Sequence, residues 1–266
     1  MKRFRCIDDP SLTGFENMSR DEAMLDLACS FPVPPTLRFF QWDRKTLSIG
    51  RLQRTDVVNI GHLDDHSIPL VRRPTGGRAI LHDRELTFSL FLPLLFFGTA
   101  LNLSLHYEQL KKVLYRFMES IDVDVDRETL NEPYLLSPYC FSLNVAHEIT
   151  IGGKKIIGVA QARSKCGVLF QGSFILRADR QEIAACFQKQ ETVFEEISRN
   201  MITLGELLGT VPDRDVLIGW LVKSVEEVWE CECRWRSWFE EEIERSVELM
   251  GEKYYPGSPF ILDYKR

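Results

Sequence analysis

Residues 148–176 hold three short runs in which apolar and polar side chains alternate, and this pattern limits the fold more than any other stretch. The runs read EITI, KIIGVAQAR and VLFQGSFIL, and Gly152 and Gly153 separate the first two. Alternation at a period of two is typical of β-strands, and a glycine pair is typical of a hairpin turn. We therefore predict three consecutive strands in an antiparallel or mixed sheet.

The flanking segments predict further strands and several helices. Strand-like patterns occur at 36–42, 46–52 and 67–82, and apolar residues at helical spacing occur at 16–31, at 107–121 and after Gln181. Ser19 followed by Glu22 is typical of a helix N-terminus. Since hairpins outnumber crossover helices, we predict an α+β fold: a mixed, largely antiparallel sheet flanked by helices, with C-terminal helices.

Charge and hydropathy exclude several classes of function. A net charge of −6 disfavours a nucleic-acid partner. The apolar stretch 88–105 approaches the length of a membrane span, but Pro93 and Gly98 interrupt it, so we predict a buried strand, a loop and a helix instead. The N-terminus lacks the apolar core of a secretory signal. We expect no membrane association.

The seven cysteines are odd in number and irregularly spaced. This argues against a disulfide framework and favours a reducing compartment, so we expect a cytoplasmic protein. We predict that Cys29, Cys166 and Cys186 are inert apolar residues and that Cys231 and Cys233 lie on a helix, with no metal site. Cys140 differs, because it ends a loop-like stretch just before a predicted strand, where a nucleophile could be exposed.

Two glycine-rich segments carry cations beside glycine. RRPTGGRAILH, residues 72–82, places two arginines before a glycine pair, where backbone N–H groups can approach a carboxylate or phosphate, although a solvated turn would read the same. In GGKKIIGVAQAR, strand alternation points one of Lys154 and Lys155 inward. For His82 and His147, a hydrogen-bonding role in the core is favoured over general-base catalysis.

These two segments resemble signatures of the biotin/lipoate protein ligase and lipoyl/octanoyl transferase superfamily. RRPTGGRAILH is close to R-R-x-[S/T]-G-G-x-A-[V/I]-x-H, and KKIIGVAQAR is similar to K-[I/V]-x-G-x-A-x-x-R. The resemblance implies a class II synthetase-like and biotin-ligase-like fold, with a catalytic domain over 1–200 and a C-terminal helical segment over 201–266 packed on it. It also implies an acyl-binding site formed by these residues: Arg73, Thr75, Gly76, Gly77, His82, Lys155, Gly158 and Ala160.

The superfamily contains two mechanisms, and the resemblance is closest to the cysteine-dependent octanoyltransferases and the lipoate-protein ligase A type. Arg78 stands where typical ligases carry a third glycine, Cys140 precedes Lys155 by fifteen residues as in the transferases, and the chain is short for an accessory domain. This implies a Cys140 nucleophile assisted by Lys155, without a cofactor. The implied donor is acyl carrier protein, and the acceptor is a lipoyl-domain protein such as glycine cleavage H protein or a dehydrogenase E2 subunit.

Two alternatives stay open at this point. An ATP-dependent and Mg²⁺-dependent lipoate ligase would form a lipoyl-adenylate with Cys140 as a bystander, and a catalytically inactive relative would only bind lipoyl domains. One departure from the family pattern bears on activity: relatives read Q-H-G-[S/T], whereas this chain reads FQGSF, with no histidine before Gly172. His147 is one candidate to replace it.

Overall fold

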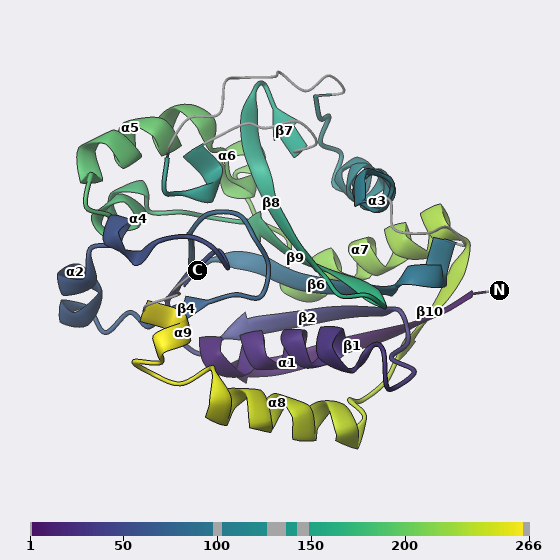
Figure 1. The fold of residues 1–266 in the computed structure, drawn as a ribbon. Helices are drawn as coiled ribbons and strands as arrows, with labels where there is room; N and C mark the ends of the chain where they lie inside the picture. The colour runs from purple at the N-terminus through teal and green to yellow at the C-terminus, as the bar shows by residue number, and fades with distance from the viewer. Residues whose placement is uncertain (1, 98–102, 127–136, 143–148, 263–266) are drawn as a thin grey trace.

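A mixed sheet of seven strands organises the computed structural model, which describes residues 2–97, 103–126, 137–142 and 149–262 (Figure 1). Its order is β10-β1-β2-β6-β9-β8-β7. The strands are β1 (Lys2–Leu12), β2 (Thr36–Trp42), β6 (Glu85–Pro93), β7 (Ile149–Ile151), β8 (Lys154–Arg163), β9 (Gly167–Ile175) and β10 (Cys231–Trp235). Strand β1 is parallel to both neighbours and the other pairs are antiparallel. The predicted mixed, largely antiparallel sheet is confirmed.

A smaller sheet has the order β4-β3-β5 and carries the first glycine-rich segment. It consists of β3 (Thr46–Ile49), β4 (Leu70–Arg72) and β5 (Ile80–His82). Strand β3 pairs with both others, so the glycine turn joins two strands that flank a third. The predicted succession of strand, turn and strand is confirmed.

Helices cover both faces of the large sheet (Figure 1). Helices α1 (Gly14–Leu27) and α8 (Glu240–Glu252) pack side by side on one face, and α3 (Leu103–Ser120) and α7 (Arg214–Trp229) pack together on the other. Phe88 and Phe91 of β6 point to opposite faces, into the α3–α7 core and the α1 core respectively. The shorter helices are α2 (Ile60–Asp65), α4 (Arg180–Ala185), α5 (Gln190–Asn200), α6 (Leu204–Leu208) and α9 (Pro259–Leu262), with 3-10 turns η1 (Thr55–Val57), η2 (Leu94–Phe97) and η3 (Cys140–Ser142).

The described residues of the apolar stretch 88–105, which leave out 98–102, have the strand and the helix predicted for them. Strand β6 ends at Pro93, η2 follows, and α3 begins at Leu103. Among the helices of the described ranges, none combines the length and apolar character that a membrane span requires.

Two local predictions are wrong. Helix α1 begins at Gly14 with Thr13 as its N-cap and Glu16 closing the capping box, whereas Ser19 lies inside the helix. Cys231 and Cys233 lie on β10, not on a helix, because this segment pairs with β1 at the sheet edge. Strand β1 itself was not predicted. Strands β1 and β10 gain their hydrogen bonds from partners distant in sequence, which local periodicity does not reveal.

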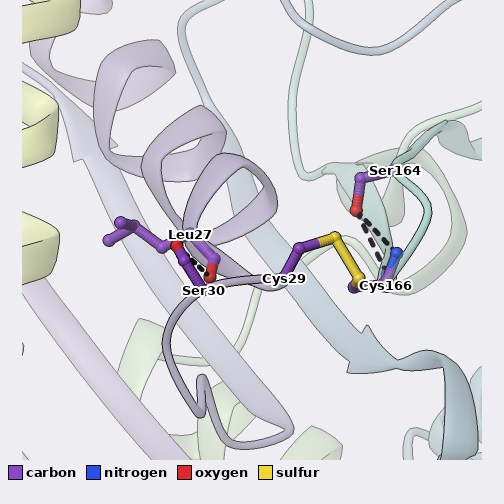
Figure 2. Close-up of a disulfide and its surroundings, with 6 residues drawn as sticks. Leu27, Cys29, Ser30, Ser164 and Cys166 are labelled. Atoms are coloured by element: carbon purple, nitrogen blue, oxygen red, sulfur yellow. Dashed lines mark hydrogen bonds between the residues drawn. A yellow bond between two sulfur atoms is a disulfide. The ribbon is translucent and has the colours of Figure 1, made fainter.

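A disulfide joins Cys29 to Cys166, so the prediction that both are inert thiols is wrong (Figure 2). Cys29 follows α1, and Cys166 lies in the turn between β8 and β9, where the Ser164 hydroxyl accepts from the backbone N–H of Cys166. The fold brings together residues 137 positions apart. Cys186 fits its prediction, since burial raises the pKa of its thiol to about 12 and keeps it protonated.

Candidate active site

The glycine turn between β4 and β5 is built around the buried guanidinium of Arg73. Its five N–H groups donate to the hydroxyl of Thr75, the carbonyl and hydroxyl of Ser48, and the carbonyls of Gly76 and Arg78. Burial lowers the pKa of Arg73 to about 10. The arginine therefore shapes the turn from within and leaves a positive charge beneath it.

Glycine is required at two positions of this turn region. Gly77 has a φ of +84°, in the left-handed region that favours glycine. Gly50 follows β3, and a Cβ at this position would lie 1.9 Å from the carbonyl oxygen of Gly77. The backbone N–H of Gly76 donates to the carbonyl of Gln161 on β8 at 3.2 Å. This bond brings the two glycine-rich segments of the sequence together.

Cys140 is anchored to the same turn. Its backbone N–H donates to the carbonyl of Ala79 at 2.9 Å, and the N–H of Ala79 donates to the carbonyl of Pro138. The guanidinium of Arg78 donates to the carbonyl of Ser137. Arg78, which stands where a ligase is expected to carry glycine, thus fastens the segment that leads to Cys140.

Lys155 contacts the sulfur of Cys140 from strand β8. Its side chain is 1% exposed, and Nζ donates to the carbonyl oxygen of Cys140 at 3.1 Å and to Sγ at 3.3 Å. Lys154 is only partly buried, which agrees with the predicted alternation. The two residues that the family resemblance pairs, fifteen positions apart in the sequence, are thus in contact through the ammonium and the sulfur.

Gly158 and Ala160, further along β8, leave room for this pair and for the turn. A Cβ at Gly158 would lie 3.4 Å from Cys140 Sγ and 3.0 Å from the ring of Phe141. Ala160 faces Gly77, whose added Cβ would lie 3.6 Å from the alanine methyl. Larger side chains along this edge of β8 would fill the space in front of the thiol.

Cys140 lines a pocket between the two sheets and α1. Met18, Phe40, Trp42, Ile80 and Val159 supply its apolar lining. The other lining residues are polar or small: Ser48, Arg73, His82, Thr87, Cys140, Gly158, Ala160, Gln171, Gly172 and Ser173. Such a site suits a ligand with an aliphatic chain and a polar head.

His82 lines this pocket with both ring nitrogens engaged by protein groups. Nε2 lies 2.7 Å from the hydroxyl of Ser48, Nδ1 contacts the carboxylate of Glu85, and Trp42 stacks on the ring at 3.9 Å between centroids. Burial acts to raise the pKa of Glu85, but His82 and the hydroxyls of Thr87 and Ser173 outweigh burial and hold this pKa below its usual value. His82 therefore belongs to a fixed polar network.

Gln171 occupies the position before Gly172 where relatives are expected to carry histidine. Its Oε1 accepts from the hydroxyl of Thr75 at 2.6 Å, and its Nε2 donates to the carboxylate of Asp21 at 2.6 Å. Asp21 is fully buried and is also bound by Arg38. Gln171 thus connects the glycine turn to α1, a role the sequence did not indicate. The predicted substitute, His147, lies outside the described residues.

Arg72, the first arginine of the pair, binds the C-terminal segment instead of the pocket. Its guanidinium donates to the carbonyls of Gly50, Arg51 and Gln53 and to those of Phe260 and Ile261 at α9. Among the described residues, no cluster of three or more His, Cys, Asp or Glu side chains could hold a metal ion.

The structure thus brings most of the predicted site residues together. Cys140, Arg73, His82, Gly158 and Ala160 line one pocket. Thr75, Gly76 and Gly77 form the turn beside it, and Lys155 contacts Cys140. The lining also includes residues that the sequence did not indicate, among them Ser48, Trp42 and Gln171.

A model of the lipoyl protein ligase A/B catalytic domain matches residues 13–226. The chain belongs to this family. Among its relatives, an octanoyltransferase LipM from Exiguobacterium sp. strain AT1b is 37% identical over 191 residues, 68% of each chain. The octanoyltransferase LipM of Exiguobacterium sibiricum is 32% identical over 254 residues, 90% of this chain and 91% of the relative.

Solved structures of the family share the fold. A bipartite lipoate protein ligase from Thermoplasma acidophilum, described together with its E2 lipoyl domain, superposes with a TM-score of 0.83 at 19% identity and covers 100% of this chain and 98% of its own. A lipoate-protein ligase A bound with ATP gives a TM-score of 0.79 at 21% identity, with 98% and 99% covered. At these identities the likeness establishes the shared fold of this α+β family.

Proposed function

We propose that this chain is an acyltransferase of protein lipoylation that moves an octanoyl or lipoyl group through a Cys140 thioester to a lysine of a lipoyl-domain protein. The observation that carries the proposal is the 3.3 Å contact of Lys155 Nζ with Cys140 Sγ, at the wall of a pocket with a partly apolar lining. The octanoyltransferase relatives, which reach 37% identity, support the same reaction.

In the first step, the thiolate of Cys140 attacks the acyl carbonyl of a thioester carried by acyl carrier protein. The C–S bond to Cys140 forms, the C–S bond to the carrier breaks, and the carrier leaves as its thiol after taking up the proton that Cys140 gave up. The ammonium of Lys155 favours the thiolate and stabilises the oxyanion of the tetrahedral intermediate. Burial of the acyl chain among Met18, Phe40 and Trp42 contributes about 0.8 kcal/mol of binding free energy per methylene.

In the second step, the amine of the acceptor lysine attacks the Cys140 thioester. The C–N bond forms, the C–S bond breaks, the amine loses a proton, and the thiolate is regenerated. The turn over Arg73, with Thr75, Gly76 and Gly77, positions the acyl carbonyl in both steps, while His82, Gly158 and Ala160 shape the pocket. This route uses no cofactor, and its acceptor is of the H-protein or E2 class.

The alternative on the same fold is an ATP-dependent lipoate ligase, in which Arg73 and Lys155 would hold an adenylate. The attachment of Arg78 to the Cys140 segment favours the transferase. In a ligase, a glycine is expected at this position so that the backbone can approach the adenylate phosphate. Here the position carries an arginine whose side chain donates to the carbonyl of Ser137.

Intact-mass spectrometry separates these functions. One sample contains the protein and octanoyl-acyl carrier protein, and the other contains the protein, lipoate, ATP and Mg²⁺. We expect an octanoyl adduct in the first sample that hydroxylamine removes and that Cys140→Ser lacks. A lipoyl-adenylate in the second sample, with no adduct in the first, would show a ligase instead of a transferase. No adduct and no adenylate in either sample would favour a protein that only binds lipoyl domains.

A further inference from the structure

The loop of residues 50–54, which follows β3, contacts both the glycine turn and the segment that leads to Cys140. Gly50 packs against the backbone of Gly77 in the glycine turn. On the other side, the side-chain amide of Gln53 donates to the carbonyl of Pro138, two residues before Cys140, at 2.8 Å. The loop therefore contacts both the glycine turn and the segment that carries Cys140.

The polar groups of the 50–54 loop are turned inward. The backbone N–H of Arg51 donates to the carbonyl of Thr75 at 2.9 Å, and Arg72 binds the carbonyls of Gly50, Arg51 and Gln53. Since the backbone is held at so many points, the loop has a fixed shape, and its outward side chains present a preformed surface.

Leu52 projects from this surface and is 75% exposed. A single exposed leucine is ordinary on a protein surface, but this one belongs to a loop whose Gln53 is hydrogen-bonded to the segment that leads to Cys140. A second exposed apolar residue lies nearby: Leu262, which is 44% exposed, accepts at its carbonyl from the hydroxyl of Thr55.

The charge beside Leu52 is positive. Arg51 is exposed and, within the part of the chain that the structure describes, its guanidinium forms no hydrogen bond or ion pair. Arg54, by contrast, is neutralised by Asp56 at 2.6 Å. A partner surface complementary to this loop would place an apolar contact on Leu52 and a carboxylate beside Arg51. The positive charge of Arg51 is local, since the net charge of this chain is −6.

We propose that the 50–54 loop is the docking site for an acidic carrier domain, which buries Leu52, pairs with Arg51 and extends its acyl-bearing arm to Cys140. This inference rests on the proposed function, because it assigns the surface by which the donor of the thioester relay is recognised. A small thioester needs no such surface, and this difference makes the proposal testable.

The test compares two donors for the loading of Cys140, measured as the initial rate of adduct formation by intact-mass spectrometry. The donors are octanoyl-acyl carrier protein and the octanoyl thioester of N-acetylcysteamine. The variants are Leu52→Asp and Arg51→Glu, with Val247→Asp as a matched control, because Val247 is 63% exposed on α8 and lies outside the pocket. We expect each loop variant to slow carrier loading by about tenfold and leave loading by the small thioester unchanged.

Each other outcome overturns a distinct statement. Carrier loading of Leu52→Asp at the wild-type rate would exclude the loop as the docking site. An equal loss with both donors would also overturn the proposal, since the loop would then support the active site itself. A wild-type protein that no donor loads would overturn the proposed function instead.

Discussion

Lys155 Nζ lies 3.3 Å from Cys140 Sγ and 3.1 Å from the carbonyl oxygen of the same residue. One ammonium thus contacts both the sulfur of the proposed nucleophile and the backbone that carries it. The lysine is fixed on β8 by the sheet, whereas Cys140 is fixed by the glycine turn. The pair is therefore preorganised by two independent parts of the fold, as a covalent relay requires.

Replacement of Lys155 by methionine should slow the formation of the Cys140 thioester by about 100-fold or more, because the charge that we propose to stabilise the thiolate and the oxyanion is lost. Methionine fills a similar volume, so the fold should be kept, and Lys154→Met on the outward side is the matched control. Single-turnover mass spectrometry measures the effect, and a wild-type rate for Lys155→Met would exclude the proposed role.

Gln171→Leu should lower the free energy of unfolding by about 1–3 kcal/mol, since it leaves Thr75 without its acceptor and removes a donor from buried Asp21. Gln171→His supplies the side chain expected in relatives and should retain more loading activity than leucine, because an imidazole N–H can donate to Asp21. Urea unfolding and loading rates check both. A leucine variant as stable and active as wild type would show that the connection to α1 is dispensable.

Arg72→Lys should loosen the C-terminal segment. An ammonium has three donors and cannot reach five carbonyls spread over two segments, so we expect a loss of about 3 kcal/mol in unfolding free energy. Limited proteolysis near α9 should also become faster. Arg236→Lys, at an exposed position, is the control and should change neither. Unchanged proteolysis of Arg72→Lys would contradict the account.

The double variant Cys29→Ser, Cys166→Ser should be less stable by about 2–5 kcal/mol, because the disulfide closes a loop of 137 residues and restricts the unfolded chain. Wild-type protein treated with a reductant should lose a similar amount, and the double variant should not respond to reductant. Urea unfolding with and without dithiothreitol measures this. Equal midpoints for oxidised and reduced wild type would show that the bond does not form or does not contribute.

Glu85 predicts a pH dependence of stability. Its folded-state pKa lies below the ordinary 4.5, so its ionised form stabilises the fold above that pH, and this contribution disappears as the pH falls through the folded-state pKa. The difference in unfolding free energy between wild type and Glu85→Gln should therefore be largest above pH 4.5 and shrink in more acidic solution. A difference that is constant from neutral pH to pH 3 would contradict the network drawn around His82.

Much of the site could be predicted because its residues lie in two contiguous segments. The glycine pair that ends at Gly77 predicts a tight turn, and Gly77 has a left-handed backbone conformation. Alternation along β8 predicts that one of Lys154 and Lys155 points inward, and Lys155 is the buried one. The pairing of Cys140 with Lys155 came from the resemblance to the family, since spacing alone does not give a distance. The division at residue 200 stays a prediction.

The rest depends on contacts between distant segments. Strand β10 pairs with β1, which also pairs with β2, Cys29 meets Cys166 across the fold, and Gln171 meets Asp21 from a different element. These partners lie too far apart in the sequence for the pattern of any short segment to predict their contact. Arg72 and Arg73 are adjacent and identical in type, yet one binds the C-terminal segment and the other supports the pocket, a difference that only the sheet geometry decides.

The central claim is that the acyl group passes through Cys140, and a chase experiment tests it most directly. The octanoyl-enzyme is isolated free of donor, mixed with a lipoyl-domain protein, and followed by intact mass over time. The account predicts that the octanoyl mass leaves Cys140 and appears on the acceptor lysine at a rate at least equal to turnover. An acyl-enzyme that keeps its octanoyl group, while free donor and enzyme still modify the acceptor, would contradict it.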